Sequence, residues 1–167
     1  MKKYLTIITL ALLLSSCHGD PPMVVPNGTN KNLKEHMINA NRTITQAEET
    51  AIEEYISRRQ WKMEKLADGV RMLEYERGTG SIVNPDDSVT IVYTIDAING
   101  KRFYDNVDET YVAGRRRDMA GLDEAVQRLR HGSKAKVILP SNLGYGIGGD
   151  GDRIPQSAIL IIDLEVK

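Results

Sequence analysis

The sequence predicts an α+β fold in which a curved antiparallel sheet, a half-barrel, wraps around one short helix and follows an N-terminal helical extension. In residues 89–95, Val89, Ile91, Tyr93 and Ile95 alternate with Thr90, Val92 and Thr94, which is the period of a half-buried strand. Residues 121–130 carry apolar side chains at helical spacing, and the apolar segments 134–139 and 157–166 follow as further strands. One helix beside several antiparallel strands is typical of this class.

The start of the chain has the pattern of a processing signal. The basic residues after Met1 precede the apolar run Tyr4–Leu14, which is shorter than the ~20 residues that a transmembrane helix needs and fits a secretory signal. Leu14-Ser15-Ser16-Cys17 then resembles a bacterial lipobox, in which residues 1–16 are removed and Cys17 is acylated. An ordinary cleavage site beside an incidental thiol is the alternative. Lipid on Cys17 predicts a membrane-anchored protein of the cell envelope. No acidic run follows Cys17, which favours an anchor on the inner or outer membrane that faces the periplasm over surface export.

Between the anchor and the sheet, the sequence predicts a tether and then a helical extension. Residues 17–32 are rich in Pro, Gly and Asn and predict a flexible tether. Residues 33–68 predict the extension, with a short helix over Leu33–Asn41 and an amphipathic helix over about 46–59. The second helix begins at Thr45-Gln46-Ala47-Glu48, which has the spacing of a capping box. We interpret it as a helix packed on the neighbouring domain, with partner binding as the alternative.

The remaining segment, residues 69–167, contains the elements of the sheet. Val70–Glu76 predicts the first strand, and a loop separates it from the strand at 89–95. Asn99-Gly100 predicts a type I′ hairpin turn, which needs positive φ at both central residues, with Lys101–Tyr104 as the return strand. Gly132 predicts the end of the helix that starts at Gly121.

Composition excludes several classes of function. The 22 Lys and Arg balance 23 Asp and Glu, which argues against nucleic acid as a partner, and one Cys with three His gives little basis for a metal site. Gly144–Gly149 has the letters of a dinucleotide motif, but no helix can begin in the following Asp150–Pro155. Asp150 and Asp152 fit a solvated loop better than a calcium site. Arg115–Arg117 predicts a solvated basic face or a docking patch.

Several short motifs follow one another in a specific order. They are Val92-Tyr93-Thr94, Asn99–Phe103, Gly121–Val126, Gly132–Ala135, Leu143–Gly146, Ile154-Pro155 and Leu160–Glu165. This order resembles the FK506-binding-protein (FKBP) family of peptidyl-prolyl isomerases. The lipobox and the lead-in Trp61-Lys62-Met63-Glu64 further resemble gliding-motility-associated FKBP lipoproteins of Bacteroidota. The resemblance implies an isomerase without a cofactor, proline-containing polypeptide clients that fold in the envelope, and a macrolide as a further ligand.

The resemblance also implies a prolyl pocket and residues that line it. These are Tyr93, Phe103, Asp105, Met119, Leu122, Tyr145, Ile154 and Ile162. The Tyr145 hydroxyl and the Met119 N–H would donate hydrogen bonds to substrate carbonyls. An apolar pocket with a few fixed donors is all that rotation about an X-Pro bond requires, because a twisted amide is less polar than a planar one.

Three departures from the family pattern bear on activity. Leu122 replaces the usual Trp of the pocket floor, and Ile162 replaces an aromatic wall. The acidic residue that usually follows the pocket Phe is Tyr104 here, so a role for Asp105 requires a local shift of the chain. These changes imply weak isomerase activity. The alternative is a catalytically weak or inactive FKBP-fold chaperone or binding module, or an accessory of a surface machine.

Overall fold

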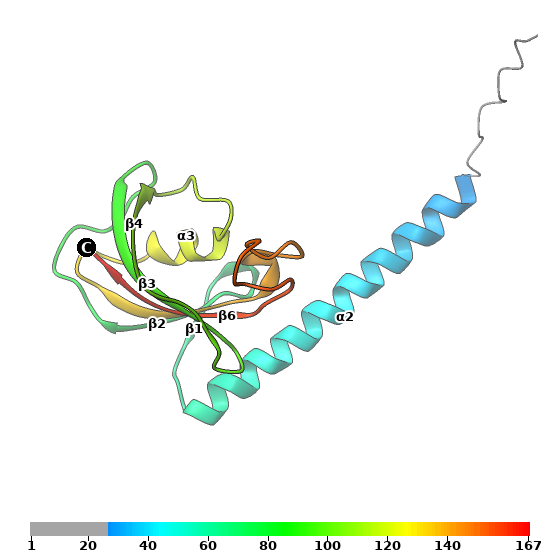
Figure 1. The fold of residues 1–167 in the computed structure, drawn as a ribbon, viewed down its shortest axis with the longest axis horizontal. Coiled ribbons are helices and arrows are strands. Elements are labelled where there is room, and N and C mark those ends of the chain that lie inside the picture. Colours follow the sequence, from blue (N-terminus) through cyan, green and yellow to red (C-terminus); the bar gives the residue numbers. More distant parts are fainter. Residues whose placement is uncertain (1–26) are drawn as a thin grey trace, which may run out of the picture. The chain divides into compact units, whose positions relative to one another are not determined.

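The computed structural model describes residues 27–167, with side chains from Asn32 onward (Figure 1). The predicted signal, Cys17 and most of the predicted tether lie outside the described residues. The chain divides into two units, Met1–Ile38 and Asn39–Lys167, and the second contains the sheet. Within the described residues, no helix combines the length and the apolar character needed to cross a membrane.

The extension is one uninterrupted helix, α2 (Asn27–Arg59), so the prediction of two helices is wrong. The helix begins at Asn27, inside the predicted tether. The Thr45 hydroxyl donates to the Asn41 carbonyl at 2.9 Å, as those of other threonines in this helix do to carbonyls four residues earlier. A hydroxyl that donates to the carbonyl four residues earlier lies within a helix and does not accept an N–H at the start of a new one. The capping-box spacing at Thr45 therefore does not mark a helix start.

The described strands form a single antiparallel sheet in the order β1-β2-β5-β6-β3-β4, and with the short helix α3 (Ala120–Val126) they confirm the predicted α+β class. Figure 1 shows the sheet curving around α3. The strands are β1 (Glu64–Lys65), β2 (Arg71–Glu76), β3 (Ser88–Ala97), β4 (Arg102–Val112), β5 (Lys134–Leu139) and β6 (Leu160–Val166). The 3-10 turns η1 (Ala67–Gly69) and η2 (Ser141–Leu143) precede β2 and follow β5.

Three boundaries differ from prediction. Strand β6 begins at Leu160 and not at residue 157. Helix α3 ends at Val126, well before Arg130, which instead pairs with Ile82 in an isolated bridge. Strand β4 continues to Val112, past the predicted end at Tyr104, because residues 107–112 still pair with residues 88–93 of β3. A strand with polar side chains on its exposed face carries a weak sequence signal.

The β3–β4 turn is of a different type from the one predicted. Gly100 has a φ of +88°, whereas Asn99 is not among the residues with positive φ, so a type I′ turn is excluded. The Gly100 N–H donates to the Ala97 carbonyl at 2.8 Å, and the Ala97 N–H donates to Lys101 at 2.8 Å. Of the two turn residues only Gly100 takes the left-handed conformation, as in hairpins with a type I turn and a bulge.

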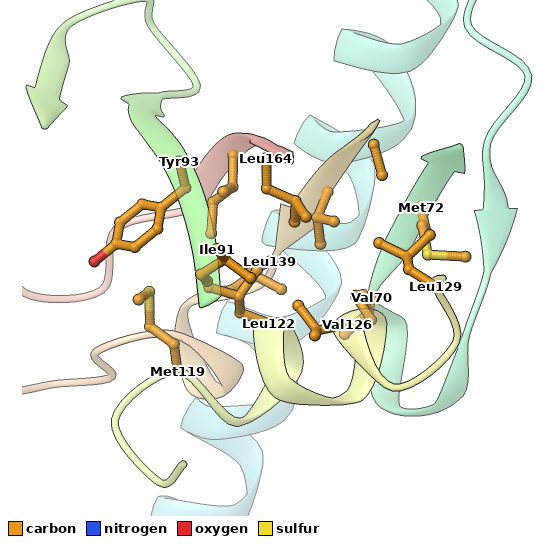
Figure 2. Packing of buried hydrophobic residues seen from close by; sticks show 14 of the residues in the cluster. Val70, Met72, Ile91, Tyr93, Met119, Leu122, Val126, Leu129, Leu139 and Leu164 are labelled. Carbon is orange, nitrogen blue, oxygen red and sulfur yellow. The ribbon is translucent and has the colours of Figure 1, made fainter. Parts of the chain in front are cut away.

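The two faces of the sheet carry separate apolar clusters. The inner face, which carries α3, holds the main cluster, and Figure 2 shows Leu122 and Val126 of α3 against Leu139 and Leu164 of the strands. A Cβ on Gly121 would lie 2.8 Å from a Leu139 methyl, so this glycine allows α3 to approach β5 closely. The outer face holds a smaller cluster, in which Ile52 and Tyr55 of α2 pack with Ile138 and Ile161, and with Ile56, Trp61, Met63, Ile98 and Ile159 at its margin.

Candidate functional site

Most of the predicted pocket residues belong to the inner-face cluster. Tyr93 comes from β3, Phe103 from β4, Ile162 from β6, and Met119 and Leu122 from the start of α3. Buried members of the cluster are Tyr93, Phe103, Met119, Leu122, Ile154 and Ile162, and Tyr145 is partly buried against them. In Figure 2 the Tyr93 hydroxyl and Met119 lie on one side of Leu122. The fold therefore brings these residues together from distant parts of the sequence.

The structure does not bring Asp105 to this cluster. Its carboxylate is exposed, pairs with Arg102 at 2.9 Å and accepts a hydrogen bond from the Thr94 hydroxyl at 3.4 Å. Tyr93 pairs with Val107 and Ile95 pairs with Tyr104, so two β4 residues face the single Thr94. This is a β-bulge, and Asn106 takes a φ of +51° within it. The local shift exists, but it turns Asp105 outward.

A network of charged side chains around the buried Arg116 guanidinium borders the cluster beside Tyr93. The Tyr93 hydroxyl donates to Glu109 Oε2 at 2.9 Å, and Arg116 Nη1 donates to the same oxygen at 2.9 Å. Arg116 also bonds both oxygens of Asp118, and its guanidinium lies 5.9 Å and 5.3 Å from the ring centroids of Tyr93 and Tyr111. Its side chain is 5% exposed, so the prediction of a solvated basic face is wrong for Arg116.

The protonation states of this network follow from its contacts. Burial and the hydrogen bond to Glu109 raise the pKa of Tyr93 to about 12, so its hydroxyl keeps its proton and stays bound to Glu109 at neutral pH. Although burial opposes the charged form, Asp118 and Glu109 raise the pKa of Arg116, which therefore remains a cation. Burial, followed by the charge of Asp118, raises the pKa of Tyr145, so its hydroxyl remains a neutral donor.

The loop that carries Tyr145 is tied down at both ends. After it, Asp150 Oδ1 accepts the N–H groups of Asp152, Arg153 and Ile154 at 2.8–2.9 Å, and Asp150 Oδ2 accepts the Tyr104 hydroxyl. Asp150 thus caps the loop, and residues 151–154 form bends without a helix, as the sequence predicts. Before Tyr145, the η2 turn holds the loop to the end of β5.

Sequence reasoning missed Glu109, Arg116 and the Tyr104–Asp150 pair. Glu109 pairs with Ile91, a buried inner-face residue, so its side chain lies on the inner side of β4. Had the strand been predicted over the full range 102–112, its alternation would have placed the Glu109 carboxylate on the inner side. The partner of that carboxylate could not be found, because Arg116 comes from a loop.

Two further features complete the description of the site. A groove of about 410 Å³ runs between the β3–β4 turn and residues 155–159, and of the predicted site residues Phe103 lines it.

Among residues 27–167, no group of three or more His, Cys, Asp or Glu side chains is placed to hold a metal ion.

Residues 80–167 match the family model described as FKBP-type peptidyl-prolyl cis-trans isomerase. The chain belongs to this family. It is 37% identical to FK506-binding protein 2 of Dictyostelium discoideum over 84 residues, 48% of this chain and 63% of that protein. It is 33% identical to the FKBP-type peptidyl-prolyl cis-trans isomerase FkpA of Aeromonas hydrophila over 118 residues, 68% of this chain and 44% of that protein.

The solved structures agree with the sequence relatives. The crystal structure of a peptidyl-prolyl cis-trans isomerase from Pseudomonas syringae pv. tomato has a TM-score of 0.60 and 26% identity, covering 73% of this FKBP-family chain and 92% of that chain. The chain spans less than two thirds of the length of the Dictyostelium and Aeromonas relatives. Helix α2 and strands β1 and β2 precede the segment that matches the family model.

Proposed function

We propose that the chain is a peptidyl-prolyl cis-trans isomerase, anchored by lipid on Cys17 in the cell envelope, that acts on X-Pro bonds of envelope proteins as they fold. The observation that carries the proposal is the meeting of Tyr93, Phe103, Met119 and Ile162 in one apolar cluster, with the half-buried Tyr145 against it. Uncatalysed X-Pro isomerisation takes tens of seconds or more, which is slow enough to limit folding.

The arrangement suits rotation about an amide bond. The barrier is about 18–20 kcal/mol because amide resonance is lost as the bond turns. Apolar walls favour the twisted amide over the more polar planar one, and the neutral Tyr145 hydroxyl donates to a substrate carbonyl. The Met119 N–H would donate in the same way. No nucleophile takes part in such a mechanism.

The second candidate is a binding module that holds proline-containing segments without rapid turnover. Met119, Leu122 and Ile162 are completely buried, so the floor of the cluster is closed by its own side chains. The Tyr93 hydroxyl is already bound to Glu109. Both observations favour slow entry of a proline ring and therefore weak catalysis.

A protease-coupled proline-peptide assay separates the two candidates. The protein without residues 1–16 and with Cys17→Ser would be compared with its Tyr145→Phe and Phe103→Ala variants. We expect Tyr145→Phe to lower kcat/KM about tenfold, the effect of one lost hydrogen bond to the transition state. Tyr75→Phe is the matched control, since the Tyr75 hydroxyl bonds Asp163 on the outer face. FK506, the ligand in the name of one relative, is expected to inhibit the reaction.

The outcomes discriminate clearly. A folded protein with no rate above the spontaneous one, but with measurable binding of the proline peptide, is a binding module. Activity that neither substitution changes would remove the site assignment. Circular dichroism of Phe103→Ala is needed beside the assay, because truncating a buried Phe destabilises a domain by about 3–5 kcal/mol.

The lipid anchor is supported by the lipobox pattern Leu14-Ser15-Ser16-Cys17. Several acyl chains, each contributing about 0.8 kcal/mol per buried methylene, would hold the protein on a membrane. In a bacterial host, Cys17→Ala is expected to abolish incorporation of labelled palmitate and to move the protein into the soluble fraction. Cys17→Ala protein that still sediments with membranes after a salt wash would contradict the anchor.

A further inference from the structure

The backbone on both sides of Tyr145 is hydrogen-bonded to Ser141. Ser141 is buried and begins the η2 turn that follows β5. Its carbonyl oxygen accepts the N–H of Gly144 at 3.2 Å and the N–H of Gly146 at 2.8 Å. These two glycines flank Tyr145, so Ser141 positions the Tyr145 peptide. The Pro140 carbonyl, which also accepts the Gly144 N–H at 3.3 Å, and the Ser157 N–H, which donates to the Gly146 carbonyl at 2.8 Å, support the same segment.

Ser141 is in turn held by a residue from the extension helix. Its N–H donates to Glu48 Oε2 at 3.0 Å, and its hydroxyl donates to Glu48 Oε1 at 2.6 Å. Both oxygens of one carboxylate therefore bind one residue, which fixes the orientation of the pair and uses the stronger hydrogen bonds of a charged acceptor. Glu48 is 93 residues distant from Ser141 in the sequence.

The neighbours of Glu48 explain why it arrives in a fixed position. Glu49 and Glu53 on the same helix bind Arg71 of β2 at 2.5 Å and 2.6 Å. Ile52 packs into the outer-face cluster. The helix is thus docked by residues other than Glu48, and the contact of Glu48 is with the residue that carries the Tyr145 loop.

We propose that Glu48 is a positioning residue for Tyr145, so that helix α2, which precedes the segment matching the family model, takes part in forming the isomerase site. This inference rests on the proposed function. Loss of the Glu48–Ser141 contact lets the Tyr145 loop relax while the sheet remains folded. The donor hydroxyl then spends less time in the position that a substrate carbonyl requires.

The test compares three substitutions in the same protein used for the activity assay. Glu48→Ala is expected to lower kcat/KM about tenfold, and Glu48→Gln, which keeps one acceptor oxygen, to lower it less. Glu54→Ala is the matched control, because Glu54 is exposed and pairs only weakly with Arg58, at 4.0 Å. It should leave kcat/KM unchanged.

A double substitution distinguishes positioning from simple stabilisation. If Glu48 acts through Tyr145, Glu48→Ala should lower kcat/KM much less in a Tyr145→Phe background than in the parent. Its effect on the melting temperature should be the same in both backgrounds. An equal fold loss of kcat/KM in the two backgrounds would overturn the inference and leave Glu48 a structural residue.

Amide hydrogen exchange tests the same coupling without relying on catalysis. The Gly146 N–H, bonded to Ser141, should exchange faster in Glu48→Ala than in the parent or in Glu54→Ala, while amides of β5 and β6 keep their protection. Unchanged exchange at Gly146 would overturn the coupling whatever the activity. A protein that lacks isomerase activity but shows faster Gly146 exchange in Glu48→Ala would refute the proposed function alone.

Discussion

The inner face of the sheet is closed by α3 through apolar side chains, whereas the outer face meets α2 largely through charged ones. On the inner face, Leu122, Ala125 and Val126 of α3 are completely buried among strand residues. On the outer face, Arg71 is buried between Glu49 and Glu53, with only a small apolar cluster beside it. The same sheet thus holds its two helices by different forces.

This difference has consequences for how each face responds to change. Apolar burial is roughly proportional to area and independent of direction, so the packing of α3 on the inner face does not depend on the screening of charges by salt. Ion pairs depend on the charge of each partner and on screening by salt, so the outer face should respond to both. The two responses can be measured separately, because β5 sends neighbouring side chains to opposite faces.

Truncation of two neighbouring residues of β5 should have the largest effect. Leu139 belongs to the inner cluster and Ile138 to the outer one, and both are completely buried. Leu139→Ala is expected to lower the free energy of unfolding by about 4–5 kcal/mol, because the densely packed inner cluster cannot close the cavity. Ile138→Ala should cost about 2–3 kcal/mol, since the smaller cluster can relax. Urea unfolding measures both, and a larger cost for Ile138→Ala would reverse the comparison.

The inner face is also the part that the sequence predicts well. Alternation at 89–95 and the apolar run at 134–139 correspond to β3 and to β5 within a few residues, because burial on one side imposes a period of two. Helix α3 was predicted from its apolar spacing in the same way. Phe103, Met119 and Tyr145 are placed with this cluster by the motif order of the resemblance, not by periodicity.

The outer face and the charged parts of the site could not be predicted in this way. A sequence shows that Glu48, Glu49 and Glu53 are acidic, but it does not reveal that Ser141 and Arg71 are their partners. The same limit applies to Glu109 and Arg116 beside Tyr93. Asp105 shows the converse error, since a β-bulge turns outward a carboxylate that motif order places near the pocket.

Removal of the buried cation on the outer face should have an intermediate effect. Arg71→Met is expected to lower the free energy of unfolding by about 1–3 kcal/mol, less than for a fully buried pair, because Glu49 and Glu53 are partly exposed. The parent protein should lose part of the same stability in about 1 M NaCl, where screening acts within ~3 Å. Arg71→Met should be less sensitive to salt.

The control for this prediction is Leu139→Ala, whose salt dependence should equal that of the parent because its outer face is intact. Amide exchange in residues 48–56 of α2 should increase in Arg71→Met before exchange in β5 does. Equal salt dependence of the parent and Arg71→Met would show that the outer face is not held by charge.

The smallest expected effect concerns the pH dependence of the free energy of unfolding, to which a different ionisable group contributes on each face. The hydrogen bond from Lys65 lowers the pKa of Glu49 below its ordinary value of 4.5. Burial opposes this shift, and the hydrogen bond from Arg71 adds to it. The Glu49 contribution is present above that ordinary value and is lost as pH falls through the lowered pKa. Burial and Glu109 raise the pKa of Tyr93 from 10.0 to about 12. The Tyr93 contribution is complete below pH 10.0 and is lost as pH rises toward 12.

Two conservative substitutions test these contributions, one at Glu49 on the outer face and one at Tyr93 on the inner face. Glu49→Gln should flatten the fall in stability below about pH 4.5 and leave the alkaline side unchanged. Tyr93→Phe should remove the Tyr93 share of the fall between pH 10.0 and about 12 and leave the acid side unchanged. Tyr104 and the outer-face Tyr75, whose pKa values are also raised, should account for the remainder. Chemical unfolding over a pH series measures both limits, and the difference in tyrosinate absorbance between the parent and Tyr93→Phe follows the Tyr93 contribution. If either substitution altered the limit assigned to the other face, the two faces would be coupled through the sheet, since charge on one face would then be determining protonation on the other.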